Sequence, residues 1–415
     1  MLSKLFLFLI IHQSIFCQLI TIPYTTRIVT KQIEIPIRYK TKPVSLNIDL
    51  TMPFTWTCVA NTDMTDLWDK PTYNITVENQ KSSAYNLPYD LFFKRDDQEL
   101  QDKVNINLYL IDIKSRLDLS IGAWGFGLQM KEEKYSFMQQ LKNNGIIEHR
   151  KFGFEATNNR EGFFHIGGMP DRITKEKHLT KCKVEERYSK SNWGCLLREI
   201  SFVDDSGNKL VYPGINRKTV SYFQTYSNSM QVPLSFMNYL KDNVLKQHFN
   251  ANKDCDYFVG FDFDYIKCKC DIKLPSISFV FGENKYTLSL NDMSNRFYTD
   301  LYCNLDFITF REESNEFVFE NVFLDKFILE FDYDEKTINF YTDYQPEFIG
   351  NFLDAISLSL NVNKNYLLSG IIAIGLLIEV IGCLAIVRYL TGKKEKYQPK
   401  KNKSIIDDLL SSQIV

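Results

Sequence analysis

The sequence predicts a mainly β protein that carries one transmembrane helix near its C-terminus. Apolar and polar residues alternate in many short runs between about Thr21 and Thr342, which is the pattern of half-buried antiparallel strands. Polar turns separate these runs, and few segments have helical periodicity. One long apolar run follows near the C-terminus. The clearest strand-like runs begin at Ile33, Val44, Val104, Phe163, Ile277 and Phe327.

The first element of the chain is predicted to be a targeting segment. Lys4 precedes an apolar stretch from Leu5 to Cys17 that is too short to span a bilayer. A positive charge before a short apolar stretch is typical of a secretory signal peptide, here with cleavage near Cys17 or Gln18. Residues 1–17 are therefore predicted to be a signal peptide, and a buried N-terminal helix is the alternative.

Two segments of the globular part have helical patterns. The run SFMQQLKNNG begins with Ser136 as a candidate N-cap and ends at Gly145 as a stop. A second helix is predicted from Pro233 or Leu234 to about His248. Helices are thus a minor part of the predicted fold.

The C-terminal part is predicted to cross a membrane once. After a juxtamembrane stem at residues 346–365, Tyr366–Val387 is a run of 22 residues with one charge. Lysine and arginine cluster behind it, which predicts that residues 388–415 are a basic cytoplasmic tail. Glu379 lies within the span, where it either faces a partner helix or is merely tolerated. The prediction is a type I membrane protein of the secretory pathway or cell surface, with a luminal or extracellular ectodomain.

Composition and motifs exclude several classes of function. The net charge of −2 gives no general attraction for nucleic acid. The chain contains no phosphate-binding loop, no nucleophile elbow and no H-E-x-x-H helix. Cys268 and Cys270 form a C-x-C, but no other pair stands at the spacing of zinc ligands. We therefore expect no cofactor, no metal and no nucleic-acid partner.

The luminal cysteines predict disulfide bonds. Seven cysteines lie between the predicted signal peptide and the span, so one is left over, and Cys58 is the candidate for it. Asn74 begins the luminal N-x-[ST] sequon, which predicts one glycan. The six cysteines predicted to form disulfides are Cys182, Cys195, Cys255, Cys268, Cys270 and Cys303.

The first half of the predicted ectodomain contains motifs of a known family. VSLNIDLTMPFTW, from Val44, resembles the first active-site strand and loop of pepsin-like aspartic proteases. In that family a strand ends in Asp-Thr-Gly, and a Trp follows seven positions after the Asp. Asp49 and Trp56 stand at this spacing. IGAWGFGL, from Ile121, is similar to the family's apolar-apolar-Gly segment, and KFGFEATNN and GFFHIGGMP follow in the family's order.

The second half repeats the scheme, as the internal duplication of this family implies. KTVSYFQTYSNSMQVP, which ends in Pro233, resembles the second active-site loop, and VFENVFLDKFILEFDYDEKTINFYT, from Val318, resembles the closing segment. Cys270 and Cys303 flank a hairpin at a spacing similar to that of the family's second-lobe disulfide. The resemblance covers roughly residues 33–342.

The resemblance implies a mainly β, bilobal pepsin-like fold. It implies an N-terminal lobe at residues 18–175 and a C-terminal lobe at residues 176–345, in front of the stem and the span.

The catalytic pair of this family is incomplete in the chain. Its members use two aspartates that share one proton and hold a water between them. Asp49 stands at the first position, but Gln224 stands at the second. A carboxamide has no titratable proton, so it cannot be half of such a pair. Asp49 is then more simply a loop residue that accepts hydrogen bonds from nearby amides.

The glycines of the two loops are replaced as well. Thr51 and Tyr226 stand where the family has Gly, and the chain contains no glycine before Gly122. We therefore expect that neither the first loop nor the glycine-bearing flap is built in the usual way. Tyr85 and Tyr89 are the candidate flap tyrosines. The Gly of the closing segment is replaced too, by a glutamate at position 320.

The predicted function is that of a membrane-anchored pseudo-protease, although the question of enzymatic activity stays open. Its interlobe cleft would bind a peptide or protein ligand for binding, adhesion or scaffolding. One alternative is a divergent membrane-anchored aspartic endopeptidase, with Asp204 or Asp205 as the other acid. Another is a trafficking factor that acts through its span. The residues predicted to line the cleft are Thr51, Trp56, Thr225, Tyr226 and Ser227.

Overall fold

The computed structural model describes residues 19–26, 33–39, 42–51, 55–59, 72–77, 80–92, 103–112, 122–128, 136–157, 161–186, 192–204, 206–225, 227, 229–250, 253–296, 301–310 and 315–348. Nearly all of them fall in one compact unit, Met1–Glu347, and a second unit comprises Phe348–Val415. The predicted signal peptide, membrane span and basic tail lie outside the described residues, as does Glu379. Within the described ranges, no helix is both long enough and apolar enough to cross a membrane.

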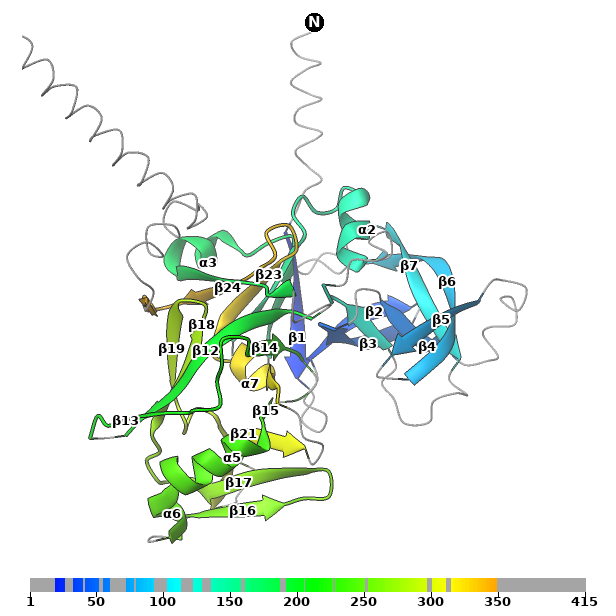
Figure 1. Cartoon of the computed structure of the whole chain (residues 1–415). Coiled ribbons are helices and arrows are strands. Elements are labelled where there is room, and N and C mark those ends of the chain that lie inside the picture. The colour runs from blue at the N-terminus through cyan, green and yellow to red at the C-terminus, as the bar shows by residue number, and fades with distance from the viewer. Residues whose placement is uncertain are drawn as a thin grey trace, which may run out of the picture. The chain divides into compact units, whose positions relative to one another are not determined.

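The described part is mainly β, as predicted, and is built on two large sheets (Figure 1). The 13-stranded sheet runs, in spatial order, through β11 (His178–Lys183), β24 (Thr337–Thr342), β23 (Ile328–Asp332), β9 (Lys151–Ala156), β10 (Glu161–Ile166), β1 (Ile20–Thr26), β2 (Ile33–Tyr39), β3 (Lys42–Asp49), β8 (Gly122–Gly125), β4 (Trp56–Val59), β7 (Lys103–Asp112), β6 (Gln80–Phe92) and β5 (Thr72–Val77). The 12-stranded sheet runs through β16 (Cys255–Val259), β17 (Phe263–Lys269), β21 (Tyr302–Phe310), β15 (Met230–Gln231), β22 (Phe317–Phe319), β14 (Val220–Phe223), β12 (Gly194–Val203), β18 (Ser276–Phe281), β19 (Asn284–Ser289) and β25 (Glu347–Phe348), with β13 (Lys209–Val211) beside β12 and β20 (Ser294–Arg296) beside β21.

The helices are short. They are α2 (Phe137–Asn143), α3 (Asp171–Glu176), α5 (Leu234–Tyr239), the π-helix η5 (Leu240–Val244), α6 (Lys246–Asn250) and α7 (Asn321–Leu324). The first predicted helix is confirmed as α2, although the Ser136 side chain makes no capping hydrogen bond. Gly145 ends it with a φ of 68°, a conformation that glycine adopts without strain.

The second predicted helix is divided into α5, η5 and α6. The division occurs at a wide turn in which the Leu245 amide donates to the Leu240 carbonyl oxygen at 2.8 Å. Both leucines are fully buried. Residues five apart point in different directions on an α-helix, so the wide turn brings both side chains into the core.

The same arrangement of four strands occurs once in each sheet. In the first sheet β3 is parallel to β8, β8 is antiparallel to β4, and β4 is parallel to β7. In the second sheet β14 is parallel to β22, β22 is antiparallel to β15, and β15 is parallel to β21. In each sheet two further antiparallel strands follow these four, namely β6 and β5 in the first sheet and β17 and β16 in the second. The fold therefore contains an internal duplication.

Strands from the end of the chain complete the first sheet. β23 pairs with β9, and β24 joins β23 to β11. The predicted lobe boundary at residues 175/176 consequently divides the sequence without dividing the hydrogen-bonded sheet.

Trp193 lies at the centre of an aromatic core that both halves of the chain share. Its side chain is fully buried, and its indole N–H donates to the Phe126 carbonyl oxygen at 2.7 Å. Its ring lies 5.2 Å from that of Phe331 and 4.9 Å from that of Tyr333, measured between centroids. Phe331 in turn stacks on Phe152 at 4.8 Å. Such offset and edge contacts add to the free energy gained by burying aromatic area.

The prediction of disulfide bonds is confirmed. Cys182 pairs with Cys195, Cys255 with Cys268, and Cys270 with Cys303. The last pair is the one that the family resemblance implied. The Cys58 side chain lies outside the described residues.

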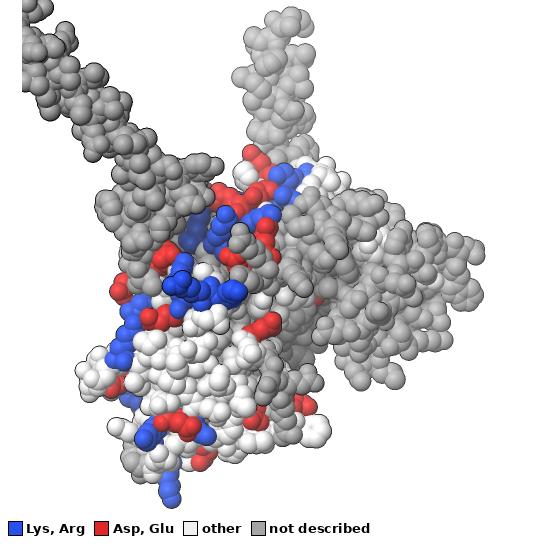
Figure 2. All heavy atoms as spheres, in the orientation of Figure 1, with Lys and Arg blue, Asp and Glu red and all other residues white. Residues whose placement is uncertain are grey.

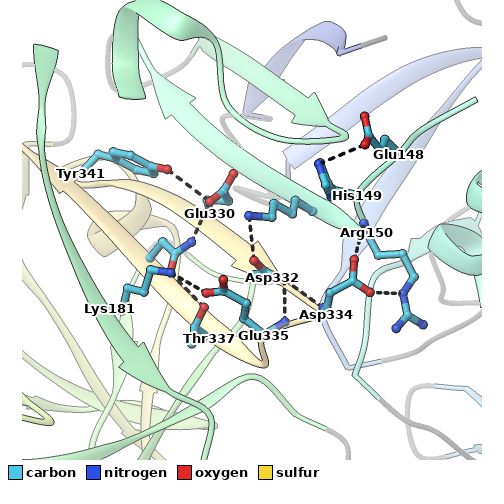
Figure 3. Close-up of polar contacts among 12 residues, drawn as sticks. Glu148, His149, Arg150, Lys181, Glu330, Asp332, Asp334, Glu335, Thr337 and Tyr341 are labelled. Carbon is cyan, nitrogen blue, oxygen red and sulfur yellow. Dashed lines mark hydrogen bonds and ion pairs between the residues drawn. The ribbon is translucent and has the colours of Figure 1, made fainter. Parts of the chain in front are cut away.

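A polar network surrounds the turn between β23 and β24 (Figure 3). Asp332 is fully buried, and its carboxylate accepts hydrogen bonds from the amides of Asp334 and Glu335. The Lys151 ammonium lies 2.8 Å from its other oxygen. Arg150 donates to Asp334 at 2.8 Å. The acidic side chains of this turn are therefore paired with backbone amides and basic residues beside the hairpin.

A buried histidine connects β1 to its neighbours. His165 on β10 is fully buried and lies directly opposite Thr21 on β1. Its Nδ1 is 3.0 Å from the Thr21 hydroxyl, and its Nε2 is 3.0 Å from the carboxylate of Glu155. Both guanidinium nitrogens of Arg172 donate to the same carboxylate. This network holds the first described strand against β10.

The network should make the fold less stable in acid. Burial lowers the pKa of His165, and the nearby Glu155 carboxylate offsets only part of that effect. Burial raises the pKa of Glu155, but hydrogen bonds from Arg172 and His165 outweigh it and lower the pKa overall. Both folded-state pKa values lie below the unfolded ones, so their stabilisation is present above about pH 6.5 for the histidine and about pH 4.5 for the glutamate. It is lost as the pH falls through the folded-state values.

The measurement is the thermal unfolding midpoint at a series of pH values from 7 to 4. It should fall with pH, and it should fall less in His165→Gln. The exposed His178 supplies the control, since His178→Gln should leave the pH dependence as it is in the wild type. Equal pH profiles for all three proteins would contradict the assignment.

Candidate active site

The first loop begins where β3 ends. Asp49 is the last residue of β3 and is 1% exposed. Its Oδ1 accepts hydrogen bonds from the Thr51 amide and the Thr51 hydroxyl, both at 2.7 Å. The Phe126 amide donates to the Asp49 backbone carbonyl at 2.7 Å, which ties the loop to the residues after β8.

The first loop directs an amide at this carboxylate without the glycine that the family has there. Thr51 supplies the amide itself, and its hydroxyl adds a second donor. Among the described non-glycine residues, only Lys253 and Lys336 have positive φ, so Thr51 makes the turn without a left-handed conformation. A threonine can replace glycine here because the turn requires the amide's direction and not a positive φ.

The second loop begins where β14 ends. Gln224 follows β14, and its amide donates to the Phe319 carbonyl oxygen at 2.9 Å. The hydroxyl of the buried Thr225 donates to the carbonyl oxygen of Ile48, the residue before Asp49. The two loops are therefore joined directly by a side-chain hydrogen bond.

The internal duplication fixes which residues of the two loops correspond. Ile48 lies beside Trp124 in the first parallel pair, and Phe223 lies beside Phe319 in the second. The residue before Trp124 is Ala123, which pairs with Trp56, and the residue before Phe319 is Val318, which pairs with Gln231. Both loops therefore contain the same number of residues. Asp49 and Gln224 occupy equivalent positions.

A buried glutamate stabilises the second loop. Glu320 follows β22 and is fully buried, at the position equivalent to Gly125 in the first sheet. Its carboxylate accepts a hydrogen bond from the Ser227 amide at 3.1 Å and another from the Gln231 side chain at 3.2 Å. The substitution of the family's glycine thus fills the space behind the loop with a hydrogen-bonding carboxylate.

Gln231 on β15 and Asn321 at the start of α7 help to hold the second loop but were missed by sequence reasoning. The Asn321 amide donates to the Ser227 carbonyl at 3.0 Å, and its side chain donates to the Thr225 carbonyl at 3.4 Å. A signal for Gln231 was present, because it follows Gln224 at the spacing by which Trp56 follows Asp49.

Some residues predicted to line a ligand cleft do not expose their side chains. Trp56 is fully buried and Thr225 is 1% exposed, so both belong to the core and that part of the prediction is corrected. Thr51 and Ser227 are partly exposed and remain candidates for ligand contact. Tyr226 lies outside the described residues. Trp56 begins β4, and its side chain lies in the core.

The other acid proposed for an active enzyme does not lie in either loop. Asp204 is exposed in the turn between β12 and β13, where its carboxylate accepts hydrogen bonds from Ser206 and Asn208. Asp205 lies outside the described residues. The candidate flap tyrosines Tyr85 and Tyr89 both lie within the paired part of β6.

The chemistry of the two loops is that of one carboxylate and one carboxamide at equivalent positions. Asp49 is held by fixed donors, and Gln224 can donate and accept hydrogen bonds without titrating. Such a pair can orient a water or a peptide group, but it lacks the second ionisable oxygen that acid–base exchange between two carboxylates needs.

On the face drawn in Figure 2, the charged side chains of the described residues are of both signs. Figure 2 shows Lys and Arg side chains interspersed with Asp and Glu over the described face. Such interspersed charges give little long-range steering.

Comparison with known proteins finds a matching family and a solved structure with a similar fold. The family described as eukaryotic aspartyl protease matches residues 118–342, which include Gln224 and end at the last residue of β24. The loop of Asp49 precedes the matched part. No curated protein sequence matches the chain.

A solved structure has the same fold. The crystal structure of Basic 7S globulin from soybean is 12% identical to this chain, with a TM-score of 0.58, and the alignment covers 79% of this chain and 97% of the globulin. At that identity the likeness concerns the fold alone.

Proposed function

Because the chain belongs to the eukaryotic aspartyl protease family, we propose that its pepsin-like part is a pseudo-protease that binds an extended peptide segment without hydrolysing it. The observation that carries this proposal is the place of Gln224. It stands at the position that the internal duplication makes equivalent to Asp49. The mechanism of this family needs two carboxylates, and this chain has a carboxylate at only one of the two equivalent positions.

The retained groups are suited to binding. Asp49 keeps two donors on one oxygen, and Thr225 joins the two loops across the site. A fold that keeps this frame can still hold an extended chain by backbone hydrogen bonds. Thr51 and Ser227, both partly exposed, are the residues we assign to ligand contact.

The proposal includes a membrane anchor and a luminal or extracellular location. Two features of the sequence support it, the short apolar N-terminus and the apolar run Tyr366–Val387 with basic residues behind it. Glu379 in that run is the position we assign to a partner helix. The anchored ectodomain would then act in adhesion or scaffolding.

One observation favours the second candidate, a divergent membrane-anchored endopeptidase. Glu320 is a carboxylate that the structure buries directly behind the second loop. An aspartic mechanism would require it to share a water with Asp49 in place of the residue at 224. Its hydrogen bonds to Ser227 and Gln231 favour a structural role instead.

The deciding experiment measures peptide hydrolysis by the full-length protein in mild detergent. A mixed peptide library is incubated from acid to neutral pH, with and without a transition-state inhibitor of aspartic proteases. We expect no cleavage that the inhibitor blocks. Cleavage that the inhibitor blocks and that disappears in Asp49→Asn would overturn the pseudo-protease proposal. If the cleavage were also lost in a separate Glu320→Gln variant, Glu320 would be the second acid.

Binding is measured in parallel by selecting displayed peptides on the immobilised protein. We expect enriched peptides with a shared side-chain pattern, whose binding weakens at least about tenfold in Ser227→Trp, since a bulky ring would obstruct the loop. Ser206→Trp, in the exposed turn after β12, is the matched control and should bind as the wild type does. Absence of any selected peptide would contradict the binding function.

A further inference from the structure

The hairpin of β16 and β17 forms one end of the second sheet. β16 pairs with β17 on one side, and no described strand pairs with it on the other (Figure 1). The Cys255–Cys268 disulfide joins the two strands near the start of the hairpin. α6 precedes β16 and lies at its beginning (Figure 1). β16 is thus an edge strand that is fixed to β17 by the strand pairing and by a disulfide.

Alternate residues of β16 direct their backbone groups away from the sheet. The Gly260 amide donates to the Phe263 carbonyl at 3.1 Å, and the Lys269 amide donates to the Asp254 carbonyl at 2.8 Å. Hydrogen-bonded pairs alternate along an antiparallel ladder, so even-numbered residues of β16 bond to β17. Tyr257 and Val259 therefore present their N–H and C=O groups outward, and no described residue outside the ladder bonds to them.

Apolar side chains surround this free edge. Val259 is 67% exposed and Phe261, in the turn, is 91% exposed. Phe258 and Phe263 are each 39% exposed, and Phe258 stacks on Tyr265 at 5.4 Å. An exposed edge strand with apolar side chains and no proline is a template for pairing with another chain.

The corresponding edge of the 13-stranded sheet differs from β16 in that it contains a predicted glycosylation site. β5 occupies the place equivalent to β16, and it contains Asn74 of the predicted glycosylation sequon. A glycan on an edge strand obstructs pairing because it is bulky and hydrated. β16 contains no sequon.

The charges along the hairpin are complementary to those of a second, antiparallel copy. Lys253 precedes β16 and Asp262 lies in the turn that follows it. Both side chains are exposed, and neither makes an ion pair with another described residue. In an antiparallel pair centred on Tyr257, Lys253 of each copy would lie beside the turn of the other, next to Asp262.

We propose that β16 pairs antiparallel with β16 of a second copy of this chain. The pairing joins the 12-stranded sheet of one copy to the 12-stranded sheet of the other, across a two-fold axis at Tyr257. In this register Cys255 of one copy lies opposite Val259 of the other, so that outward-facing groups meet outward-facing groups. About six interchain hydrogen bonds form. Each ion pair and each apolar contact occurs twice, as two-fold symmetry requires.

Cross-linking tests the register. The full-length chain is used in mild detergent with Cys58→Ser and Cys383→Ser throughout, so that Tyr257→Cys or Phe258→Cys introduces the cysteine available for cross-linking. Under mild oxidation Tyr257→Cys should form a disulfide-linked dimer, because opposed residues lie within bridging distance. The two copies of residue 258 are displaced along the strands, so Phe258→Cys should cross-link far less. No cross-link at 257, or equal cross-linking at both positions, would overturn the proposal.

Sedimentation equilibrium tests the role of the backbone. Val259→Pro removes an outward N–H while leaving the ladder to β17 intact, and it should raise the dimer dissociation constant at least about tenfold. Val259→Thr keeps the N–H and nearly the same shape, so its dissociation constant should stay close to that of the wild type. A monomeric wild type would overturn the proposal. A Val259→Pro variant that dimerises as the wild type does would overturn it too, because the dimer would then use another surface.

Discussion

Replacing Trp193 by alanine should lower the free energy of unfolding by about 3–5 kcal/mol. The indole is fully buried among Phe152 on β9, Phe331 on β23 and Tyr333 in the turn after it, and this packed surrounding cannot easily close the space. The change also leaves the Phe126 carbonyl without its donor. Urea unfolding of the wild type and the variant, followed by tryptophan fluorescence and circular dichroism, measures the difference.

A milder substitution separates the two contributions. Trp193→Phe retains an aromatic ring but no N–H, so it should cost less than the alanine change. Leu301→Ala, at a side chain that is 76% exposed, should alter stability by less than about 0.5 kcal/mol. If Trp193→Ala proved as mild as Leu301→Ala, the aromatic core around Trp193 would not be a major source of the fold's stability.

Replacing Lys151 by methionine should lower the free energy of unfolding by about 2–3 kcal/mol at neutral pH. The Lys151 ammonium lies 2.8 Å from the carboxylate of Asp332, which is fully buried at the turn between β23 and β24 (Figure 3). Removing it leaves a buried negative charge that keeps two backbone amides but no cation. Chemical unfolding at pH 7 gives the difference.

The second partner provides the diagnostic control. Adding Asp332→Asn to the methionine variant should restore part of the loss, since the amide keeps its oxygen acceptor and carries no charge. Lys175→Met removes an exposed pair with Asp171 and should have little effect. A loss of equal size at Lys151 and Lys175 would mean that burial of the carboxylate does not control the energy.

Local patterns in the sequence were sufficient for the clearest strands and the first helix. Alternation of apolar and polar residues is set by the two-residue period of a strand, so β3, β7 and β18 could be located without any knowledge of their partners. Gln224 was assigned by its resemblance to a family motif. The strand pairing of the two loops then placed it opposite Asp49 in the internal duplication.

Properties that depend on distant residues were decided by the tertiary structure. The sequence indicated Trp56 and Thr225 as cleft residues, but both side chains are buried, and the Thr225 hydroxyl donates to the Ile48 carbonyl oxygen. Glu320 was recognised as a replaced glycine, whereas its hydrogen bonds to Ser227 and Gln231 became visible only in the fold.

The sequence by itself indicated the clearest strands, the six cysteines that lie in disulfides, and Gln224 at the position where the family resemblance expects a second aspartate. The tertiary structure decided which strands share a sheet, which side chains are buried beside the two loops, and that β16 ends its sheet without a neighbour. The physical reason is that periodicity and residue chemistry are local properties. Strand pairing and burial, in contrast, depend on contacts between residues far apart in the chain.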